Sequence, residues 1–226
     1  MSISQDPVRP APPAGHPAST PVNPVVESSP APADRGRPPV GRERLQRYLG
    51  EVEAIRLDAR AVVGGLTADQ FNWSPSPKRW SVGQCIEHLT LTARLYPARI
   101  EAMIEESRQR EARGERAYRE GVFKEWFIHS MEPPPKLRVR TMSRVEPRRQ
   151  LEPDAVLLDF DGAYAILEEL MTRADGVSLV HARMPSPFVS MMHFTLGQVF
   201  ALNLAHARRH LWQAWQVRSD PGFPQS

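Results

Sequence analysis

The sequence contains a single cysteine, Cys85, among 226 residues. One thiol excludes an intramolecular disulfide and fits a reducing compartment, so we expect a cytoplasmic protein. Polar residues and prolines follow Met1 where a secretory signal would have an apolar region. No run approaches the roughly 18 apolar residues that cross a bilayer, so we expect no membrane span and no membrane partner.

Lysine is almost absent, because only Lys78, Lys124 and Lys136 are present and the other basic residues are arginine. The formal net charge is +3, and the arginines are dispersed among carboxylates. No helix-turn-helix, RNP or zinc-finger pattern accompanies this charge. We therefore expect no nucleic-acid partner.

Large apolar residues are scarce in the first forty residues, which are rich in proline. Such a segment cannot bury enough apolar surface to offset the entropy that it would lose on ordering. We expect residues 1–40 to form a disordered, Pro-rich tail with some polyproline II character. Residues 41–220 are long enough for one domain.

Four segments of this domain have the three- and four-residue apolar spacing of helices. They cover about 42–66, 81–104, 153–174 and 195–218. Pro97 should kink the second segment, because proline lacks the N–H that an interior helical position uses. The pattern predicts an all-α fold.

Two of the segments begin with the same signal. SVGQ at 81–84 and TLGQ at 195–198 are capping boxes, each able to satisfy two backbone amides at a helix start. His88 then lies on the order of 10 Å along its helix, while His210 and His206 lie roughly 12 and 18 Å from the end of the last helix. These depths match best if the two helices are antiparallel.

The lengths of the connections between the helices predict the direction of each helix in the bundle. Residues 67–80 form a modest loop, whereas residues 113–152 form a long connection that can carry the chain back along the bundle. Helices two and three are then parallel, which gives an up-down-down-up four-helix bundle. Within the long connection, residues 121–131 fit a short helix or a strand, and residues 136–145 alternate like an extended segment.

His206 and His210 lie four residues apart on the stripe of the last helix that should be apolar. Imidazoles at this spacing can bind one metal ion, and His88 offers a third ligand from the facing helix. An H-x-x-x-H pair also arises by chance on exposed helices, but buried polar groups need partners. Three ligands leave a position open to water or substrate, and imidazole suits zinc, nickel or iron. Zinc is our default because it is widely available.

Other polar residues near the histidines have two interpretations. Asn203 could orient a water or a substrate in catalysis, or it could fill the core by hydrogen bonding to a histidine. Gln213 could support a metal ligand, or join two helices. Glu87 should point away from the metal and be solvated or ion-paired. Cys85 should be a buried apolar residue rather than a ligand.

Two further predictions concern aromatic and basic residues. Trp80 should pack in the core rather than bind a cofactor. Arg138, Arg140 and Arg144 could attract the carboxylates of a cofactor, although a solvated charged loop is the favoured interpretation.

Two segments resemble the DinB-like superfamily of damage-inducible, metal-binding bundles, which is unrelated to the polymerase of the same name. PSPKRWSVGQCIEHLTLTARLY is similar to the loop and second helix of that superfamily, with its Trp-Ser pair and its helical histidine. HFTLGQVFALNLAHARRHLWQ is similar to its last helix, with H-x-x-x-H. The resemblance covers about residues 42–218. One departure is Met192-His193-Phe194, where the superfamily commonly has His-Pro.

The resemblance implies an up-down-down-up bundle with a metal site at His88, His206 and His210. It also implies a metal-dependent enzyme that transfers a low-molecular-weight thiol, such as bacillithiol or mycothiol, to an electrophile, because a thiol bound to a metal ion readily loses its proton. A homodimer is compatible with the resemblance, although the sequence shows no interface.

Two alternatives to thiol transfer stay open. One is a metal-dependent hydrolase, which needs an acid or base that the sequence does not place. The other is a non-catalytic stress protein that binds a metal or small ligand and recruits partners through its tail.

Overall fold

The computed structural model describes residues 40–134, 142–187 and 191–225. The predicted tail lies outside these residues except for Val40, and most of the segment predicted to be extended, 136–141, lies outside them too. No helix within the described ranges combines the length and the apolar character that a membrane span requires.

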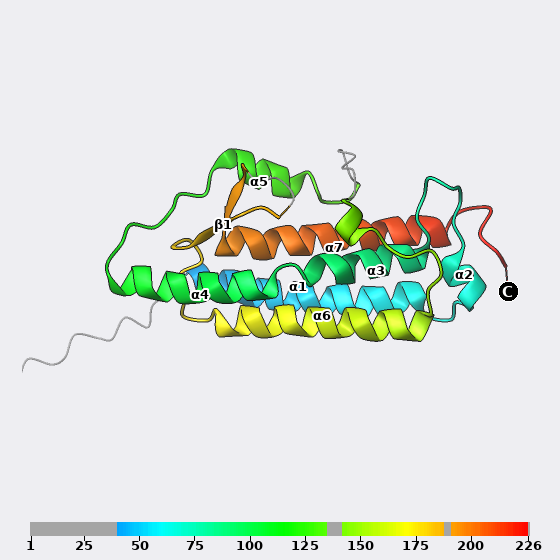
Figure 1. The fold of residues 1–226 in the computed structure, drawn as a ribbon, viewed down its shortest axis with the longest axis horizontal. Coiled ribbons are helices and arrows are strands. Elements are labelled where there is room, and N and C mark those ends of the chain that lie inside the picture. The colour runs from blue at the N-terminus through cyan, green and yellow to red at the C-terminus, as the bar shows by residue number, and fades with distance from the viewer. Residues whose placement is uncertain (1–39, 135–141, 188–190, 226) are drawn as a thin grey trace, which may run out of the picture. The chain divides into compact units, whose positions relative to one another are not determined.

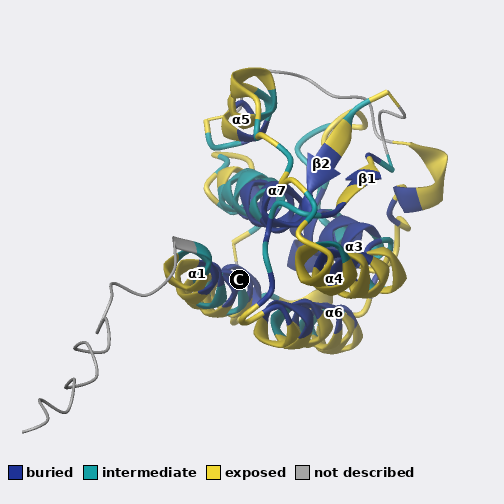
Figure 2. Cartoon of the chain, turned by 90° about the vertical axis from the view of Figure 1, so that its left-hand side faces the viewer, coloured by how far each residue is buried: buried dark blue, intermediate teal, exposed yellow. Residues whose placement is uncertain are grey.

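A bundle of four long helices forms the core of the fold (Figure 1). The long helices are α1 (Val40–Val63), α3 (Val82–Ala93) with its continuation α4 (Pro97–Ala112), α6 (Pro153–Arg173) and α7 (Leu196–Arg218). Helices α1 and α3 each pack against both α6 and α7, so α1 and α3 lie on one diagonal of the bundle and α6 and α7 on the other. The buried faces of all four meet at the centre (Figure 2).

Contacts at the helix ends establish the helix directions. Arg218 at the end of α7 donates to the carbonyl oxygens of Ala61 and Val62 at the end of α1, at 3.1 and 2.9 Å. Asn72 before α3 and Leu151 before α6 exchange two hydrogen bonds of 2.8 and 2.9 Å. Helices α1 and α7 therefore end together, and α3 and α6 begin together. Arg79, just before α3, pairs with Asp220, just after α7, at 3.1 Å, so α3 begins where α7 ends. The predicted up-down-down-up topology is confirmed.

Both predicted capping boxes are present. Ser81 Oγ accepts from the backbone N–H of Gln84 at 3.1 Å, and Thr195 Oγ1 accepts from that of Gln198 at 3.3 Å. Pro97 has a larger effect than the predicted kink, because α3 stops before it and α4 starts at Pro97 itself. Proline suits this first position because an N–H there would have no helical partner.

Short elements that apolar periodicity does not reveal occupy the connections. The expected loop 67–80 contains α2 (Ala68–Asn72), and the helix-or-strand alternative for 121–131 is settled as helix α5 (Val122–His129). The end of the segment predicted to be extended is a 3-10 helix, η1 (Ser143–Val145). Strands β1 (Arg183–Pro185) and β2 (His193–Thr195) pair antiparallel directly before α7.

Candidate metal centre

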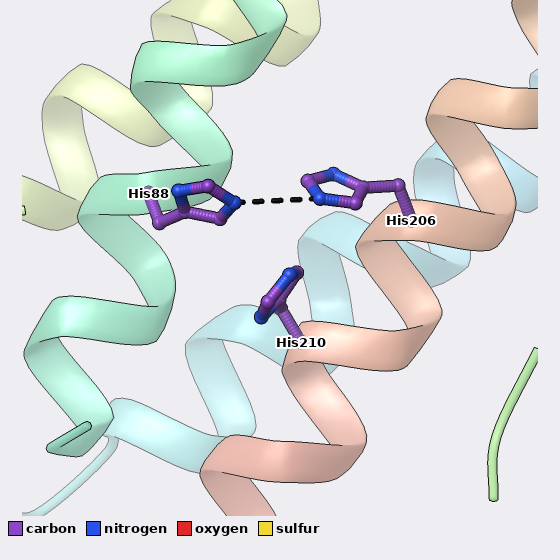
Figure 3. A group of neighbouring side chains, drawn as sticks. All are labelled: His88, His206 and His210. Carbon is purple, nitrogen blue, oxygen red and sulfur yellow. Dashed lines mark hydrogen bonds between the residues drawn. The ribbon is translucent and has the colours of Figure 1, made fainter. Parts of the chain in front are cut away.

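The three predicted histidines converge between α3 and α7 (Figure 3). His88 Nε2 lies 3.4 Å from His206 Nε2. The His210 ring centroid lies 4.7 Å from that of His88 and 4.6 Å from that of His206. One nitrogen from each ring can be chosen so that all three lie within 4.8 Å of one another. Ligand nitrogens at about 2.0 to 2.1 Å from a tetrahedral zinc ion lie roughly 3.3 Å apart, so the cluster is compact enough to hold one ion.

The 3-10 helix η1 fixes the orientation of His88. The carbonyl oxygen of Val145 lies 2.8 Å from His88 Nδ1 and accepts its proton in a hydrogen bond. This bond leaves the lone pair on Nε2, the nitrogen that faces His206. Metal-binding histidines commonly have such a partner on their second nitrogen. The long connection between α4 and α6 therefore takes part in building the site.

Burial favours the neutral form of all three imidazoles. It lowers the pKa of His88, an effect that the hydrogen bond to Val145 opposes. Burial, with the nearby charges of His88 and Arg209, lowers the pKa of His206 to about 3, although this ring keeps some exposure to the cavity. The pKa of His210 lies well below its usual value, with burial as the main cause. Neutral imidazole is the form that binds a metal ion.

One ring nitrogen of His210 has an unusual environment. Its Nδ1 is buried and has no hydrogen-bond partner in the described part of the chain. An unsatisfied buried polar atom costs about 1 to 3 kcal/mol, so it is an unusual feature of a folded protein. Within the described residues, no carboxylate or cysteine joins the cluster, and an all-imidazole set suits zinc, nickel or iron.

The histidines line a cavity of about 1180 Å³. The Trp80 ring packs against two of them, with centroid distances of 4.7 Å to His88 and 5.5 Å to His210. Besides the histidines, the polar residues on the lining include Lys78, Arg79, Thr92, Ser143, Glu146, Ser186, Asn203, Arg209 and Gln213. The cavity therefore gives the three imidazoles access to a substrate-sized space.

The family model of the DinB superfamily matches residues 51–214, which is more than half of the chain. The protein belongs to the DinB superfamily. A solved four-helix bundle supports the fold: YfiT from Bacillus subtilis, described as a probable metal-dependent hydrolase with an unusual four-helix bundle topology, aligns with a TM-score of 0.52 and 14% identity over 81% of this chain and 91% of its own. No curated protein matches the sequence.

The other residues predicted to lie near the histidines have mixed outcomes. Asn203 and Gln213 both line the cavity. The amide nitrogen of Asn203 donates to the carbonyl oxygen of Val199 at 2.9 Å, one turn earlier on α7, and not to a histidine. The carbonyl of the Asn203 side chain therefore remains the group that could act on a ligand.

Two residues beside His88 on α3 have structural roles. Glu87 is buried and accepts from the backbone N–H of Arg148 at 2.6 Å as well as from its guanidinium, so the ion-paired interpretation is confirmed and the solvated one is wrong. Cys85 is fully buried, and burial raises the pKa of its thiol. It is a core residue outside the histidine cluster, as predicted.

Several residues around the histidines were not predicted from the sequence to lie there. Trp80 packs on the imidazoles, although we predicted only a core role; its position directly before the cap of the helix that carries His88 was a usable signal. No local sequence pattern indicated that Glu146 and Arg209 would line the cavity. Of the arginines predicted to attract a cofactor, Arg138 and Arg140 lie outside the described residues, and Arg144 donates to the carbonyl of Pro187.

Proposed function

We propose that this DinB-superfamily protein is a metal-dependent hydrolase. The observation that carries the proposal is the convergence of three neutral imidazoles on the wall of a cavity large enough for a substrate. Three protein ligands leave a coordination position for the reaction. The description of YfiT, which shares the fold, as a probable metal-dependent hydrolase supports hydrolysis over thiol transfer.

His88, His206 and His210 would hold a divalent ion. When bound, such an ion lowers the pKa of a water molecule in its open position and polarises the bond to be cleaved. Trp80 packs against the rings of His88 and His210 and would help to hold them in place for the ion.

Glu146 supplies the carboxylate that hydrolysis needs. It lines the cavity and directly follows Val145, whose carbonyl holds His88. In the hydrolysis of an ester or amide, water adds to the carbonyl carbon and the bond to oxygen or nitrogen breaks. We assign to Glu146 the transfer of a proton from the water to the leaving group.

An activity assay tests the proposal. Purified protein is loaded with zinc, nickel or iron and is then given esters, amides, and thiols paired with electrophiles as substrates. We expect metal-dependent hydrolysis that falls at least about 100-fold in a His206→Ala/His210→Ala variant and in Glu146→Gln. Glu146→Gln should keep its metal, and His129→Ala, a change at an exposed histidine, should keep both metal and activity.

The competing functions give different results in the same assay. Metal-dependent consumption of a thiol and an electrophile, without hydrolysis, would establish the thiol transferase instead. Tight metal binding without any turnover would establish the non-catalytic alternative.

A further inference from the structure

The cavity lining carries an excess of positive charge. Lys78, Arg79 and Arg209 contribute three cationic side chains, and Glu146 is the one carboxylate among the lining residues that the structure describes. The imidazoles are neutral, so a bound divalent ion would add both of its charges to this excess. A cavity with such a potential attracts anions.

Arg209 is the cation most closely associated with the triad. Arg209 lies three residues after His206 and directly before His210 on α7, and it lines the same cavity as both histidines. The side chain is partly buried, and its Nη1 lies 3.6 Å from the sulfur of Met131. Burial lowers the pKa of Arg209. An anion that reached this guanidinium would meet a positive charge that water screens only in part.

The two other cations are more exposed than Arg209. Lys78 and Arg79 are exposed, in the loop before α3, and Arg79 pairs with Asp220 at 3.1 Å. Charges in such positions are screened by solvent and salt. They can attract an anion from solution, whereas Arg209 can bind it beside the reaction centre.

An apolar surface adjoins the triad on one side. Tyr96 lies about two turns after His88, and Leu202 one turn before His206. Because α3 and α7 are antiparallel, Tyr96 and Leu202 lie on the same side of the histidines, and both line the cavity together with Phe127 and Met131. This side is suited to an apolar group of the substrate.

We infer that the substrate is an ester or amide with a carboxylate near the scissile bond and an apolar group on its other side. Arg209 binds the carboxylate, the scissile carbonyl lies at the triad, and the apolar group packs on Tyr96 and Leu202. A guanidinium matches a carboxylate with two parallel hydrogen bonds, which gives both affinity and orientation. This inference rests on the proposed hydrolase function.

A matched pair of substrates tests the inference: N-octanoylglycine, and N-octanoylglycinamide, in which the carboxylate is replaced by a neutral amide. We expect kcat/KM to favour the acid by about 10- to 100-fold. Arg209→Met should remove this preference by slowing only the acid, and Arg209→Lys should keep part of it. Arg94→Met, at an exposed arginine that caps the end of α3 and pairs with Asp159, is the control and should leave the preference intact. The metal content of each variant confirms that the site is present.

A binding measurement separates failure of this inference from failure of the hydrolase function. Ketone analogues of the two substrates, in which a methylene replaces the amide nitrogen, are titrated into metal-free protein by calorimetry. Preferential binding of the acid by wild type, lost in Arg209→Met, supports the inference even if no amide is cleaved. Equal binding of acid and amide, or equal loss of both in Arg209→Met, overturns it even if hydrolysis is observed.

Discussion

Gly83 lies directly against the ring of Phe71, so that a Cβ atom at position 83 would come within 2.5 Å of Phe71 Cε1. Phe71 belongs to α2 and is fully buried, and Gly83 belongs to the first turn of α3. The contact packs α2 onto the helix that carries His88. The glycine of the SVGQ motif therefore serves close packing, in addition to the cap made by its neighbours.

Substitutions of glycine by alanine should have opposite effects on stability at different helical positions. Gly83→Ala should lower the free energy of unfolding by about 1 to 3 kcal/mol, because the new methyl group displaces Phe71. Gly50→Ala and Gly162→Ala, where nothing lies within 4 Å of the added Cβ, should raise it by about 0.4 to 1 kcal/mol. Urea unfolding of the three variants measures the difference. A stabilising Gly83→Ala change would show that the packing described here is wrong.

The proton of His88 should reside on Nδ1 in the metal-free protein at neutral pH. The carbonyl of Val145 can only accept a hydrogen bond, so it selects this tautomer. Nitrogen NMR of labelled histidine distinguishes the two ring nitrogens directly. The exposed His129 serves as a reference that should populate both tautomers. A proton found on His88 Nε2 would mean that the ring is not oriented for metal binding in this way.

The stability of the metal-free protein should fall as the pH falls. Burial lowers the pKa of His88, His206 and His210 below 6.5, so below that pH the unfolded chain binds protons that the folded chain does not. For His206 the loss is complete near its folded pKa of about 3. Each histidine lowers the free energy of unfolding by at most about 1.4 kcal/mol per pH unit. His206 contributes less than this, because its ring keeps some exposure.

Urea unfolding at a series of pH values from about 7.5 to about 5 measures this loss of stability. The loss begins near the pKa of histidine in the unfolded chain. The His206→Ala/His210→Ala variant should show a shallower dependence on pH than wild type. Equal slopes in the two proteins would show that these histidines already titrate normally in the folded state.

Metal binding should raise the melting temperature. An ion that binds only the folded protein contributes about 4 kcal/mol at a free concentration 1,000 times its dissociation constant. We expect zinc to raise Tm and a chelator to lower it, with no response in the His206→Ala/His210→Ala variant and a normal response in His129→Ala. A double variant that responds to zinc as strongly as wild type would place the ion elsewhere.

The sequence predicted the long helices because their apolar positions repeat over many turns, and it predicted the helix starts because Ser81 and Thr195 cap their own helices. Helix α2 has the same capping box, Thr67 with Gln70, but five residues are too few for periodicity to show. Strands β1 and β2 have three residues each and depend on pairing with each other, which no local pattern encodes.

The convergence of the three histidines could be predicted because two share one helix and the third lies at a matching depth on an antiparallel helix. The residues around the histidines could not be predicted, because their positions depend on contacts between distant parts of the chain. Val145 holds His88 from 57 positions away, and Met131 meets Arg209 from 78 positions away. Both come from the long connection, whose path the sequence pattern left open.

The acceptor that orients His88 is a main-chain oxygen, and every amino acid at position 145 would provide one. Point mutations there can alter packing, but they cannot delete the acceptor. Insertions or deletions between α4 and α6 can withdraw it by rerouting the backbone. Over evolutionary time, the orientation of His88 should therefore tolerate changes in the composition of that connection far better than changes in its length.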